Sequence, residues 1–233
     1  MEAPPTPYVS ALGLVTHEMR SPASIVSGYL RLLQQDSDGL SARQRRMVDE
    51  AGRACGRMLT LLQEIGELAS VEGTVLVPSP AAVQVFDLCG DVLKSLSTQA
   101  ENGTTPVFTC HEPGCSATVD GNAAWLKRAF VALMASTARE HRAEALECHG
   151  FIGDEDGCPR AVIAFGPCGI FNRDRLLAHR ATFDRWRGGT GLSVPIACRI
   201  VEVHGGTVWS PPGADSRAVV WALPIARASG LRP

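Results

Sequence analysis

Two long stretches of helix-spaced apolar residues near the N-terminus constrain the fold more than any other feature of this 233-residue chain. Residues 10–35 and 42–70 repeat apolar side chains at intervals of three and four, which is typical of amphipathic helices. The residues between them, 36–41, read DSDGLS and predict a turn, with Ser41 as the N-cap of the second helix. Two such helices joined by a short turn form an antiparallel hairpin.

A hairpin of two helices has little with which to cover its own apolar stripe. The stripe here is wide and continues along both predicted helices. Pairing two copies of the hairpin into a four-helix bundle buries such a stripe. The sequence therefore predicts a homodimer.

A linker follows the hairpin, because VEGTVLVPSPA at 71–81 contains a glycine and two prolines. Beyond it, strand patterns alternate with helix patterns, and the helices fall at residues 87–100, 122–141 and 191–204. Such mixing predicts an α+β sandwich with helices on one face of a sheet. We expect two domains, a dimerisation hairpin at 1–72 and the sandwich at 80–228.

Composition excludes several classes of partner and compartment. The net charge of −2 gives no general attraction to nucleic acid, and no apolar run approaches the ~20 residues that a membrane span needs. The N-terminus MEAPPTPYV lacks the pattern of a secretory signal. Eight cysteines are scattered without a C-x-x-C pair, so we expect free thiols, no metal site and a cytoplasmic location.

The first predicted helix carries the string THEMRSP at 16–22. Imidazole is a good nucleophile near neutral pH, and Nε2 of His17 can attack phosphorus. Glu18 beside it can act as a general base or hold the ring in one tautomer. Pro22 removes a helical hydrogen bond and predicts a bend about one turn after the histidine. The alternative is an ordinary His–Glu pair on a solvated helix face.

This string resembles the phosphoacceptor box of the sensor histidine kinase family, H-E-L-R-T-P, with Met19 for Leu and Ser21 for Thr. The resemblance implies that His17 carries a phosphoryl group, that Glu18 assists it, and that receiver domains of response regulators are the partners. Ser21 would orient water on a partner's phospho-aspartate, as the family's Thr does. Partner specificity would lie on the hairpin at Ser27, Arg31, Arg53 and Arg57.

Residues 83–225 resemble the ATP-binding domain of the same family, but two of its three boxes are eroded. In ALMAST, 132–137, Ser136 stands where the family has a metal-ligating Asn. In FGPCGI, 165–170, Phe165 replaces the Asp that accepts from the adenine amino group, and Pro167 replaces a Gly. Phenylalanine cannot accept that hydrogen bond, whose loss costs about 1–3 kcal/mol, and it fills volume where adenine would sit.

The third box is better kept, since GGTGLSVPIACRIVEVHGG at 188–206 retains a glycine-rich turn, a helix and the H-G-G turn. Backbone N–H groups at such a helix start can cradle phosphate, although glycines there also simply make turns. The residues that would bind a nucleotide are Ser136, Gly169, Gly189 and Gly191. Between the last two boxes the family's lid would be short and basic. With two boxes eroded, no cofactor is firmly predicted, and the sequence argues against ATP and Mg²⁺.

Three functions remain open at this point. The chain is a phosphotransferase that exchanges phosphoryl between His17 and regulator aspartates, with weak or no ATP binding. Alternatively it is an active kinase core that phosphorylates His17 from ATP in a divergent site. The third possibility is a scaffold that binds response regulators without catalysis, which the intact His17–Glu18 pair disfavours.

Overall fold

The computed structural model describes residues 7–72, 80–97, 107–110, 116–141, 144–155, 157–169, 171–178, 180–185, 191–211 and 217–226. The chain divides into two compact units, Met1–Val75 and Leu76–Pro233. Cys110, His111 and Cys115 lie close together in the sequence and are of residue types that bind metals. His111 and Cys115 lie outside the described residues.

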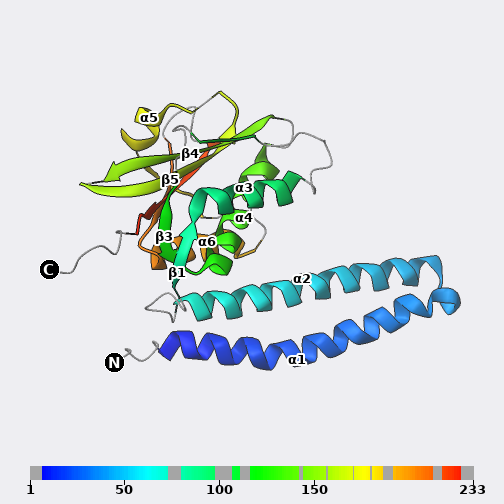
Figure 1. The fold of residues 1–233 in the computed structure, drawn as a ribbon. Coiled ribbons are helices and arrows are strands. Elements are labelled where there is room, and N and C mark those ends of the chain that lie inside the picture. Colours follow the sequence, from blue (N-terminus) through cyan, green and yellow to red (C-terminus); the bar gives the residue numbers. More distant parts are fainter. Residues whose placement is uncertain are drawn as a thin grey trace. The chain divides into compact units, whose positions relative to one another are not determined.

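The first unit is a helical hairpin of α1 (Pro7–Gln35) and α2 (Ala42–Glu72), joined through a short 3-10 turn, η1 (Ser37–Gly39) (Figure 1). Ser41 caps α2 as predicted. Its Oγ accepts from the backbone N–H of Gln44 at 3.3 Å, and the Gln44 Oε1 accepts from the backbone N–H of Ser41 at 2.9 Å. This reciprocal pair is a capping box, and it fixes the residue at which the chain reverses into α2.

Small side chains fill the seam between α1 and α2. Ala23 and Cys55 are buried at 4% and 6% exposure, and the Cys55 thiol donates to the backbone oxygen of Ala23 across the seam at 3.4 Å. Further toward the turn, the Gln34 amide donates to the Asp49 carboxylate at 3.1 Å. Small residues let the two helices approach closely, but they bury little apolar area.

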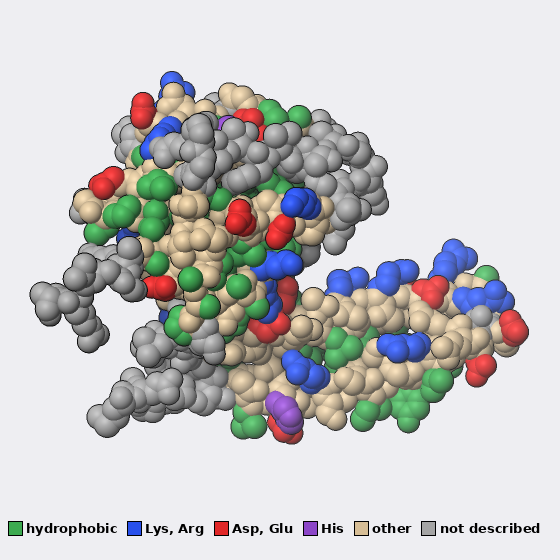
Figure 2. Space-filling model, viewed as in Figure 1, with side chains coloured by type: hydrophobic (Ala, Val, Ile, Leu, Met, Phe, Trp, Pro, Cys, Tyr) green, Lys and Arg blue, Asp and Glu red, His purple; other side chains and the backbone are tan. Residues whose placement is uncertain are grey.

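Most of the large apolar side chains of the hairpin lie outside this seam. Eleven of them are between 40% and 66% exposed, and Figure 2 shows hydrophobic side chains along the outer edge of the hairpin. On α1 these are Leu14, Val15, Met19, Ile25, Val26, Tyr29, Leu32 and Leu33, and on α2 they are Met47, Met58 and Leu61. An exposed apolar surface of this size on a monomer marks an interaction site. We call it the apolar flank.

The second unit is built on two sheets. A six-stranded sheet has the order β2-β4-β5-β8-β7-β6, in which only the β2–β4 pair is parallel. A separate antiparallel ribbon pairs β1 with β3. The strands are β1 (Ala81–Gln84), β2 (Val107–Cys110), β3 (Thr118–Gly121), β4 (Leu146–Glu155), β5 (Cys158–Pro167), β6 (Ala181–Thr182), β7 (Thr207–Ser210) and β8 (Val219–Pro224).

Three helices, α3 (Val85–Ser97), α4 (Ala123–Glu140) and α6 (Ser193–Val203), cover one face of the large sheet (Figure 1). Their core includes Phe130 of α4 against Trp221 of β8, whose ring centroids lie 5.1 Å apart. The Asn122 side chain caps α4 by accepting from the backbone N–H of Trp125 at 3.1 Å. The predicted α+β sandwich is therefore confirmed.

The other face of the sheet is also covered, which the sequence analysis did not predict. The short helix α5 (Arg173–Ala178) packs there, and Leu176 joins a core with alternate residues of four strands, namely Phe151, Val162, Ala164, Trp209, Val220 and Ala222. The Trp209 indole donates to the backbone oxygen of Leu176 at 2.9 Å. The predicted arrangement, with helices on one face of the sheet, was therefore incomplete, because α5 covers part of the second face.

Gly206 allows the turn after α6 to pass directly against β8. A Cβ at this position would lie 2.4 Å from the backbone oxygen of Ala222 and 2.7 Å from a methyl of Val201. Real Cβ atoms do not approach a carbonyl oxygen so closely, so either the turn or the strand would have to move.

We predict that Gly206→Ala destabilises the second unit by about 2–4 kcal/mol because of this overlap. The matched control is Gly90→Ala in α3, where nothing lies within 4 Å of the new Cβ. Alanine in an open helix interior should stabilise by about 0.5–1 kcal/mol. All four tryptophans belong to the second unit, so urea unfolding followed by tryptophan fluorescence measures both effects there. Equal midpoints for the two variants would contradict the packing described.

Candidate functional site

His17 stands on the surface of α1 with 82% of its side chain exposed, beside Glu18 at 72%. The ring Nδ1 lies 3.5 Å from the Glu18 Oε1. A carboxylate only accepts hydrogen bonds, so this contact requires the proton on Nδ1 and, in the neutral ring, leaves the lone pair on Nε2. The nucleophilic nitrogen in this tautomer is therefore Nε2.

The helix continues through Pro22 without interruption. Proline has no N–H, so the carbonyl of Glu18, four residues earlier, lacks its usual helical donor. Ser21 is exposed one turn after His17. The predicted weak point of the hydrogen-bond ladder is thus adjacent to the histidine, within a helix that is continuous from Pro7 to Gln35.

The hairpin has a polar flank opposite its apolar one. Residues two apart on a helix point about 200° apart, so His17 faces away from Val15 and Met19, whereas Leu14, three residues before it, lies beside it at the edge of the apolar flank. Beside His17 lies a groove of about 650 Å³ between the two helices, lined by Gly13, Thr16, His17, Arg20, Gln63, Gly66, Glu67 and Ser70. These positions recur at intervals of three and four on each helix. The α2 side of this groove, formed by Gln63, Gly66, Glu67 and Ser70, was not predicted from the sequence, because these common residues form no recognisable motif.

In the second unit, Phe165 is completely buried. It lies on β5 directly across from Cys148 of β4, and residues paired in this way point to the same face of a sheet. The Cys148 Sγ is 3.9 Å from that of Cys89 on α3, so this face is the helix-covered one. Burial raises the pKa of the Cys148 thiol. The Phe165 ring thus belongs to the apolar core between sheet and helices.

Ser136 and Pro167, the two other residues that depart from the resembled boxes, are also buried. Ser136 is 1% exposed on α4, and Pro167 ends β5. Gly169 has a φ of +80° and its N–H donates to the Glu147 carboxylate at 2.8 Å. Ser136 therefore belongs to the packed core, whereas Gly169 lies in an exposed turn with open space around it. Gly191 is described, with a φ of +103°, whereas Gly189 lies outside the described residues.

The segment between the two glycine-containing boxes, expected as a lid, is attached to the far face of the sheet over most of its described length. Arg173 donates to the backbone oxygen of Ile152, and its guanidinium lies 5.0 Å from the ring centroid of Phe151. Arg180 pairs with Glu155 and stacks 4.4 Å from the ring centroid of Trp209. These contacts, with α5 and β6, hold residues 171–178 and 180–182 as part of the fold.

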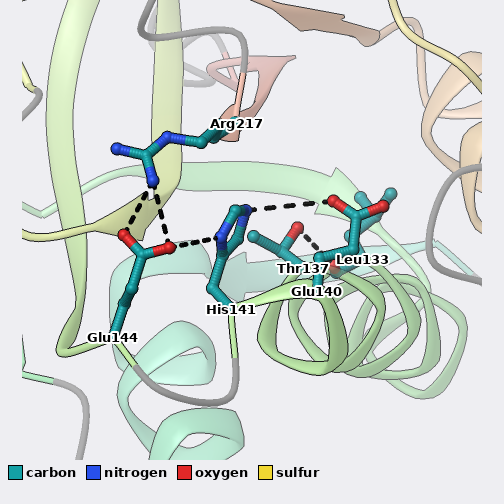
Figure 3. Close-up of polar contacts among 6 residues, drawn as sticks. All are labelled: Leu133, Thr137, Glu140, His141, Glu144 and Arg217. Carbon is teal, nitrogen blue, oxygen red and sulfur yellow. Dashed lines mark hydrogen bonds and ion pairs between the residues drawn. The ribbon is translucent and has the colours of Figure 1, made fainter.

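A polar network closes the end of α4 against the strands (Figure 3). His141, 8% exposed, contacts the Glu144 carboxylate through Nδ1 at 3.0 Å, and the Arg217 guanidinium donates to both oxygens of Glu144 at 3.0 and 2.8 Å. The His141 hydrogen bond, followed by the Arg217 charge, lowers the pKa of Glu144 despite some desolvation. The network links α4, the start of β4 and the start of β8.

The H-G-G turn contributes a buried histidine with a structural task. The His204 Nδ1 donates to the backbone oxygen of Ile200 at 2.7 Å, and Nε2 accepts from the backbone N–H of Asn122 at 3.1 Å. These two bonds specify the neutral ring and tie α6 to the start of α4. Burial lowers the pKa of His204 more than the bond to Ile200 raises it.

Comparisons with known proteins agree with this architecture. The profile of the His Kinase A (phospho-acceptor) domain matches residues 11–74. The sensor histidine kinase AruS of Pseudomonas aeruginosa is 24% identical over 95% of this chain and 23% of its own length. The sensor protein kinase PmrB of the same species is 26% identical over 93% of this chain and 46% of its own length.

Among solved structures, full-length ShkA in complex with AMPPNP superposes with a TM-score of 0.64 at 20% identity, over 94% of this chain and 47% of that one. Residues 11–74 thus match the phosphoacceptor domain of histidine kinases, the chain as a whole is similar to sensor histidine kinases, and the second unit has the α+β fold of their ATPase-type domain. It spans about a quarter to a half of the length of these two curated relatives. No helix in the described part of the chain is long and apolar enough to cross a membrane.

We predict that acid destabilises the second unit through His204. Its pKa in the folded state is below the ordinary value of about 6.5, so the unfolded chain binds the proton more tightly. The stabilisation is complete above pH 6.5 and is lost as the pH falls through the folded-state pKa. Urea unfolding from pH 7.5 to 5 should therefore show a steeper loss for the wild type than for His204→Gln. Parallel pH profiles for the two proteins would contradict the assignment.

Proposed function

We propose that this chain carries phosphoryl on His17 and exchanges it with the aspartate of a response-regulator receiver domain, without using ATP. The observation that carries the proposal is a contrast within one chain. The phosphoacceptor His17 is 82% exposed in an intact motif, whereas Phe165, at the position of the adenine-binding Asp, is completely buried in the core.

The transfer itself needs only groups that the hairpin and the partner supply. The lone pair on Nε2 of His17 attacks phosphorus of the partner's aspartyl phosphate, an N–P bond forms, and the O–P bond breaks as the aspartate carboxylate leaves. The ring becomes positively charged, and Glu18 stabilises that charge through the Nδ1 proton. The reverse reaction passes the group to a second receiver.

Three features argue against the alternative of an active kinase. Phe165 cannot accept from adenine and occupies core volume, Ser136 replaces an Asn in the expected metal-binding box, and residues 171–178 and 180–182 are attached to the far face of the sheet. A lost buried hydrogen bond alone weakens binding by about 1–3 kcal/mol. In this proposal the second unit is retained for its fold and its surface and not for binding ATP.

We also propose that the chain works as a homodimer. The apolar flank would be buried between two hairpins, leaving the polar flank with His17 open to partners. Burial of eleven half-exposed apolar side chains is a sufficient driving force, because each contributes about 1 kcal/mol or more.

The dimer can be tested with two charge substitutions on the same helix. Val26→Glu places a carboxylate in the apolar flank, where Val26 is 50% exposed, and should yield monomers in analytical ultracentrifugation. Ser24→Glu points to the polar flank and should remain dimeric. A monomeric wild type, or a dimeric Val26→Glu variant, would contradict the proposal.

The phosphoryl carrier can be tested by transfer from a ³²P-labelled receiver domain. Wild-type chain should acquire acid-labile label, His17→Gln should acquire none, and Glu18→Gln should be slowed about 10²-fold because the carboxylate that stabilises the charged ring is lost. Both variants change exposed side chains and should unfold like the wild type. Label in His17→Gln would reject the site, and label that comes from ATP in the absence of a receiver would favour the active kinase.

A further inference from the structure

Arg20 belongs to the same motif as His17, and the transfer described above gives it no task. It lies three residues after His17, and side chains at this spacing are neighbours on a helix, with Cβ atoms about 5–6 Å apart. Both residues line the groove on the polar flank. Among the described residues, Arg20 makes no hydrogen bond or ion pair.

Gly66 on α2 determines where the Arg20 guanidinium lies. A Cβ at Gly66 would be 3.8 Å from the Arg20 Nη2 and 3.6 Å from the Thr16 Oγ1. The guanidinium therefore extends from α1 across the groove to the α2 backbone. A residue with a long side chain at this position of α2 would fill the space that the guanidinium occupies.

The charges around the groove explain why a cation is needed there. A phosphoryl group on His17 adds nearly two negative charges beside Glu18, and Glu67 lines the same groove from α2. The Gln63 amide donates to Glu67 at 3.2 Å and holds that carboxylate on α2. Arg20 is the one basic residue among those that line the groove, so it alone can offset the added charge.

We propose that Arg20 binds the phosphoryl oxygens on His17 and that Gly66 keeps open the space in which it does so. This inference rests on the proposed function, because it concerns the phosphorylated form. The guanidinium presents parallel N–H donors that match two phosphoryl oxygens, and a lysine ammonium is only a partial substitute. Arg20 would favour the dianionic phosphoryl group and orient it for transfer.

The test uses the full chain phosphorylated chemically with phosphoramidate, so that no regulator or ATP is involved. The pH titration of the ³¹P resonance gives the second pKa of the phosphoryl group. Arg20→Ala should raise this pKa relative to wild type, and Arg20→Lys should recover part of the difference. Arg31→Ala, eleven residues further along α1 and also exposed, is the matched control and should titrate like the wild type. Glu18 and Glu67 are present in every variant, so differences report on Arg20.

Two substitutions at Gly66 test the same contact from the other helix. Gly66→Ala places its Cβ at ordinary contact distances and should leave the titration unchanged. Gly66→Leu should displace the guanidinium and reproduce the effect of Arg20→Ala. Both Arg20→Ala and Gly66→Leu should also slow transfer to a receiver domain about fivefold to tenfold.

The outcomes separate this inference from the function on which it rests. If wild type forms phosphohistidine that His17→Gln lacks, and Arg20→Ala titrates and transfers like the wild type, then Arg20 has no role in binding and this inference is overturned. If phosphoramidate gives no phosphohistidine on His17 in the wild type, the phosphoryl-carrier function is overturned, and the assignment of Arg20 with it.

Discussion

The division of the hairpin into two flanks is the constraint on which the rest of this structure depends. Two packed helices share only a narrow seam, and here small residues such as Ala23 and Cys55 fill it. The large apolar side chains of α1 and α2 must then lie outside the seam, on one side of the hairpin. That arrangement leaves the opposite side polar, and it is this side that carries His17 and the groove beside it.

The second unit has the α+β fold expected from the sequence, although the sequence analysis predicts that two of its three nucleotide boxes depart from the family pattern. The bonds that assemble the helices are still present, including the Asn122 cap of α4 and the His204 link between α4 and α6. At the predicted position of the adenine-binding Asp, Phe165 contributes a buried aromatic ring to the core and no hydrogen-bond acceptor. A domain can keep its packing under such changes, because core volume and apolar pattern suffice for folding.

Most of the fold could be predicted because long periodic segments carry a strong signal. Both hairpin helices, the helices α3, α4 and α6, and every described strand except β6 follow from apolar spacing and turn residues. The packing of α5 and the two-residue β6 could not be read in this way. Helix α5 has six residues, so the buried Leu176 and the partly buried Leu177 show no period, and arginines that stack on Phe151 and Trp209 look like ordinary surface charges.

The residues of the candidate site also fall into a group that the sequence predicts and a group that it does not. His17, Glu18 and Ser21 are contiguous in sequence and form a recognisable motif, so their neighbourhood on one helix was predictable. Gln63, Gly66 and Glu67 reach the same groove only because α2 returns antiparallel to α1. No short-range pattern reports that register, which depends on the length of the turn and the packing of the seam.

The central claim is that phosphoryl reaches His17 without nucleotide bound to the second unit. Isothermal titration of the full chain with Mg²⁺ and a non-hydrolysable ATP analogue tests this claim most directly. The account predicts no saturable heat up to millimolar analogue, since the buried Phe165 ring leaves adenine without an acceptor or a space. Saturable binding with a micromolar Kd would contradict it and would restore the ATP-dependent kinase as the function of this chain.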